Sequence, residues 1–97
     1  MLHLIAETSL SPSVAERIVG DDDVILQAGA VWAAFKGHSN NQFVSQLLDR
    51  NCAVYALQDA LSISGIAEHQ LLEGVKIIDY SAFVELTVKN SVIHTWC

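Results

Sequence analysis

The feature that most restricts the fold is a run of six consecutive apolar residues at positions 52–57, between Asn51 and Gln58. The run is too short to span a membrane, but it has the length of a β-strand. A strand with one solvent-facing side would alternate apolar and polar residues, because successive side chains point to opposite faces of a sheet. An uninterrupted apolar strand is typical of a parallel sheet that helices cover on both faces. The run therefore predicts an α/β protein.

Strands and helices are predicted to alternate along the rest of the chain. Short apolar stretches predict further strands at residues 2–6, 24–26, 75–78 and 91–96. Helical spacing predicts helices at residues 13–19, 30–35, 42–49, 59–65 and 79–88. Asp59 and Asp79 are expected to be N-caps, and Gly65 is expected to end a helix. In the last helix, one face is expected to consist of Tyr80, Phe83, Val84, Thr87 and Val88.

This order predicts a three-layer, mostly parallel, five-stranded sheet of the Rossmann or flavodoxin type, with right-handed crossovers and a single domain over residues 1–97. In such sheets, ligands and partners meet the carboxyl ends of the strands. The residues expected there are Glu7 and Thr8, Gln27 to Gly29, Gln58 and Asp59, and Asp79 and Tyr80.

Charge and composition exclude several functional classes. The formal net charge is −6, and the five Lys and Arg residues are scattered, so direct nucleic-acid binding is not expected. No apolar run reaches the 18 or so residues of a membrane span, and the first residues lack the basic region of a signal peptide, so a cytoplasmic protein is expected. Charged residues make up 16% of the chain, where about 25% is usual. Few charges are left to cover the surface, which predicts an oligomer.

Neither a metal nor a cofactor is predicted. The four histidines (His3, His38, His69 and His94) do not occur at ligand spacing. The three aspartates at 21–23 lack the alternating donors of a calcium loop and are expected to form a solvated loop. Gly29 stands alone between a strand and a helix, where it can make the turn, whereas phosphate-binding motifs need several glycines.

The cysteines bear on whether the chain is an enzyme. Cys52 begins the apolar strand, at the edge opposite the expected crevice, and is interpreted as a small core residue. Cys97 is expected to be exposed, but no basic residue near it in sequence would stabilise a thiolate. Residue spacing therefore favours a binding or scaffold subunit without catalytic residues, and a reactive Cys97 is the alternative.

Several aromatic residues could contact a partner. Trp32 lies off the helical face formed by Val31, Ala34 and Phe35, so it either anchors an interface or belongs to a broader buried face. For Tyr55 and Tyr80 the same two interpretations apply: each side chain either packs in the core or contacts a partner. Together with the strand ends, this predicts a partner interface that contains Gln27, Gly29, Trp32, Asp79 and Tyr80.

Over nearly its whole length, the chain resembles the TusB/DsrH family of sulfur-relay subunits. The resemblance is carried by residues 1–3, 24–30, 54–57 with Asp59, 78–80, 83–84, 86–89 and Trp96. Two departures are Ala28, where the family usually has aspartate, and Ser64 before Gly65, where arginine is frequent. A third is Gly20, because some members of the family carry a cysteine near this position.

The resemblance implies a DsrE-like fold and a non-catalytic place in a cytoplasmic heterohexamer with TusC/DsrF-like and TusD/DsrE-like sister subunits. The sulfur-carrying cysteine would lie on the TusD/DsrE-like subunit, which passes sulfur to a TusE/DsrC-like acceptor. The pathway implied first is 2-thiolation of the tRNA wobble uridine. Dissimilatory sulfur oxidation, or sulfur transfer by Cys97 itself, are the alternatives.

Overall fold

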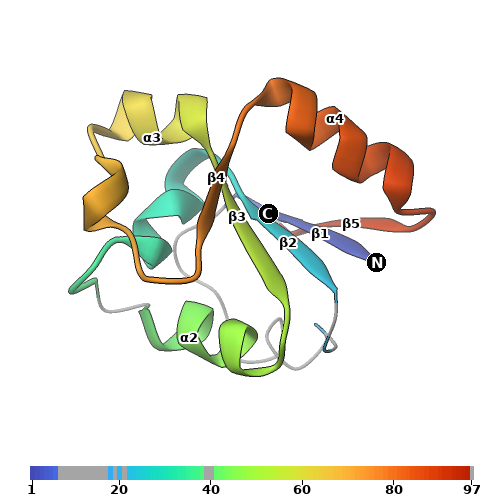
Figure 1. Cartoon of the computed structure of the whole chain (residues 1–97), viewed down its shortest axis with the longest axis horizontal. Coiled ribbons are helices and arrows are strands. Elements are labelled where there is room, and N and C mark those ends of the chain that lie inside the picture. Colours follow the sequence, from blue (N-terminus) through green and yellow to red (C-terminus); the bar gives the residue numbers. More distant parts are fainter. Residues whose placement is uncertain (7–17, 19, 21, 39–40, 97) are drawn as a thin grey trace.

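The computed structural model describes residues 1–6, 18, 20, 22–38 and 41–96 (Figure 1). The five predicted strands are confirmed: β1 (Leu2–Ile5), β2 (Asp23–Leu26), β3 (Ala53–Leu57), β4 (Lys76–Ile78) and β5 (Ile93–Trp96). The helical segments are η1 (Ala28–Ala34), α2 (Asn41–Asp49), α3 (Gln58–Ser64), η2 (Glu68–Gln70) and α4 (Tyr80–Lys89). The helix predicted at residues 13–19 falls outside the described residues except for Ile18, as do Glu7 and Thr8.

The strands form one sheet in the order β4-β3-β2-β1-β5, and every pairing in it is parallel. The connection through α4 therefore crosses from one edge strand of the sheet to the other. In the register, Leu4 lies opposite Ile25 of β2 and Thr95 of β5. Because all strands run the same way, their carboxyl ends lie along one edge of the sheet.

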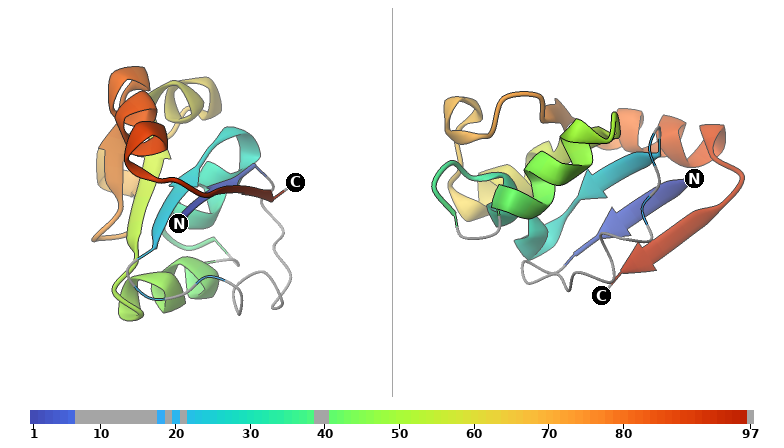
Figure 2. Two further views of the ribbon diagram at one scale, coloured as in Figure 1. Left: turned by 90° about the vertical axis from the view of Figure 1, so that its right-hand side faces the viewer. Right: turned by 90° about the horizontal axis from the view of Figure 1, so that it is seen from below.

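Each face of the sheet has its own apolar cluster, as the continuous apolar strands predict. On β2, Val24 and Leu26 join a large cluster with residues of η1, α2 and α3. Ile25 points to the opposite face and joins a smaller cluster, to which α4 contributes Phe83 and Leu86. Figure 2 shows α2 and α4 on opposite sides of the sheet, which confirms the three-layer α/β architecture.

Local signals predict the ends of two helices correctly. The Asp79 carboxylate accepts a hydrogen bond of 2.9 Å from the backbone N–H of Ala82 and caps α4. Gly65 ends α3 with a φ of 75°, in the left-handed region that glycine adopts without strain. The predicted cap at Asp59 is wrong, because α3 starts immediately after β3 and Asp59 lies within its first turn.

The predicted helix at residues 30–35 is a 3₁₀ helix that starts at Ala28. The last carbonyl groups of the segment, which have no partner within a helix, accept hydrogen bonds from outside it. The Asn41 side-chain amide donates to the carbonyls of Ala33 and Phe35 at 2.7 and 2.8 Å, and Leu72 N–H donates to Ala34 O at 2.8 Å. These bonds satisfy the C-terminal end of η1 and connect it to α2 and to the segment that follows η2.

The prediction of a solvated loop for the aspartates is wrong for the two that the structure describes. Asp22 Oδ2 lies 2.9 Å from His3 Nε2. Asp23 is buried at the start of β2 and accepts hydrogen bonds from Lys89 Nζ at 3.3 Å and from Asn90 Nδ2 at 3.1 Å. These partners are distant in sequence, so the local pattern could not reveal them.

Candidate functional site

A cavity of about 570 Å³ opens at the carboxyl ends of β1, β2 and β3. We call it the carboxyl-edge pocket. It is lined by Ala6, Gln27, Ala28, Gly29, Leu57, Ala60, Ile63 and Ser64. The cavity therefore lies at the edge of the sheet where parallel α/β proteins bind ligands and partners.

One wall of the pocket is the turn that follows β2. The Gln27 N–H donates to Ile5 O at 2.9 Å, so this residue continues the alignment with β1. Ala28 then takes a φ of +49°, an unusual backbone conformation for a residue with a side chain. Ala28 and Gly29 are both exposed. Small side chains in this turn leave the cavity open.

The other wall is α3, which follows β3 without a connecting loop. Ala60, Ile63 and Ser64 line the pocket from positions i, i+3 and i+4, which lie on one face of a helix. Ile63 is 88% exposed, although its side chain is large and apolar. The spacing of these three residues is a signal that sequence reasoning missed.

The residues of the carboxyl-edge pocket favour binding over catalysis. Gln27 and Ser64 supply the polar side chains of its lining, and the remaining residues are apolar or glycine. Among the described residues that line it, there is no cysteine, histidine or carboxylate that could act as a nucleophile or general base. Such a pocket can bury an apolar group and orient it by a few hydrogen bonds.

The five predicted interface residues do not gather in one place. Gln27 and Gly29 share the carboxyl-edge pocket. Asp79 and Tyr80 are exposed at the start of α4, after the edge strand β4. Trp32 is half-buried in η1, packs against the large cluster and lies with its ring centroid 5.2 Å from that of Phe35.

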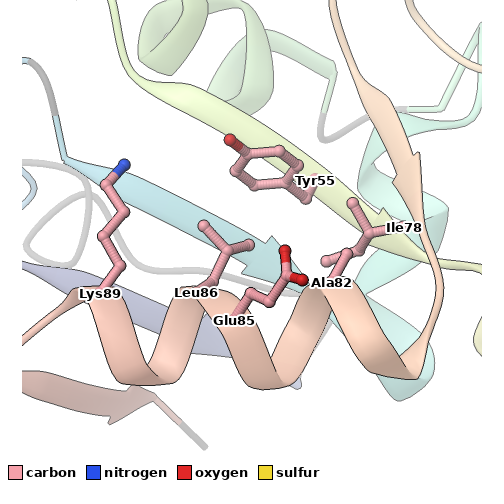
Figure 3. Close-up of a pocket in the computed structure, with 6 residues that line it drawn as sticks. All are labelled: Tyr55, Ile78, Ala82, Glu85, Leu86 and Lys89. Carbon is pink, nitrogen blue, oxygen red and sulfur yellow. The ribbon is translucent and has the colours of Figure 1, made fainter.

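A smaller cavity of about 260 Å³ lies between α4 and the sheet. It is lined by Tyr55, Ile78, Ala82, Glu85, Leu86 and Lys89 (Figure 3). Figure 3 shows Glu85, Leu86 and Lys89 projecting from α4 on the side where the Tyr55 ring lies. The helix thus leaves room between itself and β3.

Only part of the apolar face predicted for the last helix, α4, packs against the sheet. Ala82 and Leu86 contact the sheet together with Phe83. Tyr80, Val84 and Val88 point outward and are exposed. The helix has apolar residues around most of its circumference, so the sequence alone does not tell which stripe faces the sheet.

Within the part of the chain that the structure describes, the thiol of Cys52 is buried and the histidines form no metal-binding group. Cys52 is 6% exposed within the large cluster, which confirms its prediction as a core residue, and Cys97 falls outside the described residues. Gly20 is also tightly placed, since a Cβ atom there would lie 2.7 Å from the carbonyl oxygen of Arg50. Across the described ranges, no three His, Cys, Asp or Glu side chains are grouped to hold a metal ion. None of the described helices has the length and apolarity that crossing a membrane requires.

In sequence, the chain matches one family model and several proteins that share a name. A family model described as DsrH like protein matches residues 6–93. The chain is 28% identical to Protein TusB of Buchnera aphidicola, over 99% of this chain and 100% of that protein. It is 34% identical to Protein TusB of Photorhabdus laumondii, over 79% and 76% of the two chains, and 30% identical to that of Salmonella typhimurium, over 99% and 100%.

Solved structures share the fold at lower identity. The ychN protein from E. coli matches with a TM-score of 0.77 and 18% identity, covering 98% of this chain and 97% of that one. The protein of unknown function MTH1491 from Methanobacterium thermoautotrophicum matches with a TM-score of 0.78 and 18% identity, covering 98% and 96%. Both likenesses extend over almost the whole chain and support one α/β fold.

Proposed function

Because the chain belongs to the DsrH-like protein family, we propose that it is a non-catalytic subunit of a sulfur-relay complex. The observation that carries this proposal is the match of the family to residues 6–93, together with relatives named TusB that align over the full chain. The family resemblance supplies the sulfur-relay role. The chain acts in this role by supporting the subunits that hold the reactive thiol.

The placement of Cys52 supports a non-catalytic role. A sulfur carrier needs an accessible thiolate, because the thiolate attacks the sulfur donor. Cys52 is enclosed in the core and cannot meet a donor without local unfolding. At Gly20, the close carbonyl of Arg50 leaves no room for the cysteine that some relatives carry.

The complex we propose is a cytoplasmic heterohexamer with TusC/DsrF-like and TusD/DsrE-like sister subunits and a TusE/DsrC-like sulfur acceptor. The pathway is 2-thiolation of the tRNA wobble uridine. The net charge of −6 disfavours RNA binding by this chain, so we assign the contact with tRNA to a separate enzyme. In this proposal, the chain needs no cofactor for its role in the complex.

The proposed interface includes Gln27, Gly29, Trp32, Asp79 and Tyr80. Gln27 and Gly29 line an open apolar pocket, which can receive a side chain of a sister subunit. Tyr80 is 73% exposed and combines an apolar ring with a polar hydroxyl, as is common at interfaces.

Co-expression with the TusC/DsrF-like and TusD/DsrE-like subunits tests the proposal. We expect the three chains to co-purify as one assembly that transfers sulfur to a TusE/DsrC-like acceptor. The Cys97→Ser variant of this chain should support transfer at the wild-type rate. A chain that stays a monomer beside its sisters, or a loss of transfer in Cys97→Ser, would contradict the proposal.

A further inference from the structure

The cavity between α4 and the sheet exists because one helix covers only part of this face. Five strands spaced by about 4.8 Å span roughly 19 Å, whereas a helix with its side chains is about 10–12 Å wide. Among the described helices, α4 is the one that packs on this face of the sheet. Part of β3 and β4 therefore stays uncovered beside the helix, and the cavity of about 260 Å³ opens there (Figure 3). We call it the α4 pocket.

Both ends of α4 are fixed by polar contacts, so the pocket is already formed before a ligand binds. The Asp79 carboxylate caps the first turn of the helix, where β4 ends. At the other end, Lys89 and Asn90 bond the buried carboxylate of Asp23, where β2 begins. Between these two ends, the helix faces the sheet with the small side chain of Ala82. A site that needs no rearrangement loses little of its binding free energy to ordering.

The α4 pocket combines an apolar surface with a few polar groups. Its apolar side chains are those of Ile78, Ala82 and Leu86. Tyr55 contributes an aromatic ring and a hydroxyl, while Glu85 and Lys89 contribute opposite charges. Figure 3 shows the Tyr55 hydroxyl toward the Lys89 end of the pocket and the Glu85 carboxylate toward its Ala82 end. Such a combination is typical of sites that bind small molecules.

The carboxylate of Glu85 has no cationic partner in the described part of the chain. Glu85 and Lys89 are four residues apart on α4, a spacing at which Glu and Lys commonly pair. The ammonium group of Lys89 lies instead 3.3 Å from the carboxylate of Asp23. Lys76 is opposite Tyr55 in the sheet but does not line the pocket. No described Lys, Arg or His nitrogen comes within 4.0 Å of the Glu85 carboxylate, so the pocket offers this charge to a ligand.

We propose that the α4 pocket binds a small organic ammonium ion, in which one ammonium group is attached to a compact apolar group. The ammonium group is held by the carboxylate of Glu85 and by the face of the Tyr55 ring, because aromatic faces attract cations. The apolar group packs against Ile78 and Leu86. This inference is independent of the proposed function, since it concerns a different part of the molecule from the predicted thiol chemistry.

The same charges disfavour an acidic ligand. A ligand carboxylate would have to bind Lys89, whose ammonium group is already paired with Asp23. The side chain of Asp23 is 8% exposed and also accepts a hydrogen bond from Asn90, so displacing it would leave a buried carboxylate with fewer partners. A second carboxylate in the pocket would also be repelled by Glu85.

The volume of the pocket limits the size of the ligand. A water molecule occupies about 30 Å³ of the liquid, so 260 Å³ corresponds to about nine waters and to a ligand of about nine non-hydrogen atoms. A lysine side chain of another protein has a four-carbon stem and one nitrogen, and it would fill about half of this space. A free amine with an aromatic or branched hydrocarbon group fits the volume better.

Three probes test the charge and the size of the ligand on the full chain. 2-Phenylethylammonium has the proposed size and charge, 2-phenylethanol is its neutral counterpart, and n-butylammonium is equivalent to a lysine side chain. Titrations followed by backbone amide chemical shifts give both the affinity and the place of binding. We expect shifts on α4 and β3, and we expect 2-phenylethylammonium to bind about tenfold more tightly than either of the other probes.

Glu85→Gln removes the charge and keeps the size of the side chain. Glu68→Gln is the matched control, because it makes the same change on η2 and Glu68 does not line the pocket. Both side chains are exposed, so the melting temperature should stay close to that of the wild type. We expect Glu85→Gln to weaken the binding of 2-phenylethylammonium about fivefold and to leave that of 2-phenylethanol unchanged, and Glu68→Gln to bind like the wild type.

Two variants of Tyr55 separate the ring from its hydroxyl. Tyr55→Phe keeps the aromatic face and should bind 2-phenylethylammonium within about twofold of the wild type, whereas Tyr55→Leu should bind it about fivefold more weakly. Because Tyr55 is partly buried, the melting temperature of each variant is measured first to confirm that it folds.

Three results would overturn the inference. If 2-phenylethanol binds as tightly as the ammonium ion, or if Glu85→Gln behaves like Glu68→Gln, the pocket does not recognise the charge. If n-butylammonium binds as tightly as the larger amine, the pocket suits a lysine side chain rather than a compact ligand. If no probe shifts the amides of α4 and β3, the α4 pocket is not a ligand site, and the sulfur-relay proposal is unaffected.

Discussion

Replacing Asp23 tests whether the carboxylate at the start of β2 holds α4 in place. The side chain of Asp23 is 8% exposed and bonds Lys89 and Asn90, which lie 66 and 67 residues away in sequence. In Asp23→Ala, the bond between the carboxylate and the Asn90 amide is lost, and a hydrogen bond to a charged group contributes about 1.5–3 kcal/mol. Lys89 adds little, because its side chain is 67% exposed and exposed ion pairs contribute about 0–1 kcal/mol.

The expected cost in the free energy of unfolding is thus about 2 kcal/mol, which lowers the melting temperature of a chain of this size by about 10 °C. Urea unfolding followed by circular dichroism measures it, and Asn90→Ala together with the double variant gives the coupling energy between the two residues. Lys89→Met should cost less than 1 kcal/mol. A cost below about 0.5 kcal/mol for Asp23→Ala would refute this reasoning and support the solvated loop that the local sequence predicts.

Three further substitutions test separate parts of the structure. Asp79→Ala removes the cap of α4 and should cost about 1 kcal/mol in thermal unfolding, whereas Asp79→Ser should recover most of the stability; equal stability of all three proteins would exclude capping. Cys52→Ser puts a hydroxyl in the core and should cost about 2 kcal/mol, and in the Cys97→Ser variant the remaining Cys52 thiol should react with alkylating reagents only after unfolding; fast labelling of Cys52 in that folded variant would contradict its burial. Gly20→Cys should cost about 1–3 kcal/mol, because its Cβ atom would meet the Arg50 carbonyl, and a variant as stable as the wild type would show that this segment has room for a cysteine.

Local patterns were enough to predict the class of fold. Strands that are apolar on both faces require two covering layers, and this requirement is visible in the sequence around Val54 and Ile25 without knowledge of their neighbours. Helix ends that depend on one or two residues were equally accessible, as Asp79 and Gly65 show. The family resemblance was also a property of the sequence, and comparison with known proteins confirmed it.

The candidate site required contacts that no local pattern contains. The carboxyl-edge pocket combines residues from three strand ends and from α3, and sequence reasoning identified Gln27 and Gly29 but missed Ile63 and Ser64. It also grouped Asp79 and Tyr80 with them, although those residues lie at the start of α4 and do not line the pocket. The sequence predicts that these residues follow the carboxyl ends of strands, but it does not predict which strands are neighbours in the sheet.

Consecutive residues are enough to predict a covered parallel sheet and membership of the DsrH-like family, because apolar runs and family motifs are local features of the chain. The tertiary structure decided that β5 pairs with β1, that Asp23 meets Lys89 and Asn90, and that Val84 and Val88 face outward. These outcomes depend on how segments far apart in the chain pack against each other. A helix that is apolar on both sides can turn either side to the sheet, and the packing of Ala82 and Leu86 selects one.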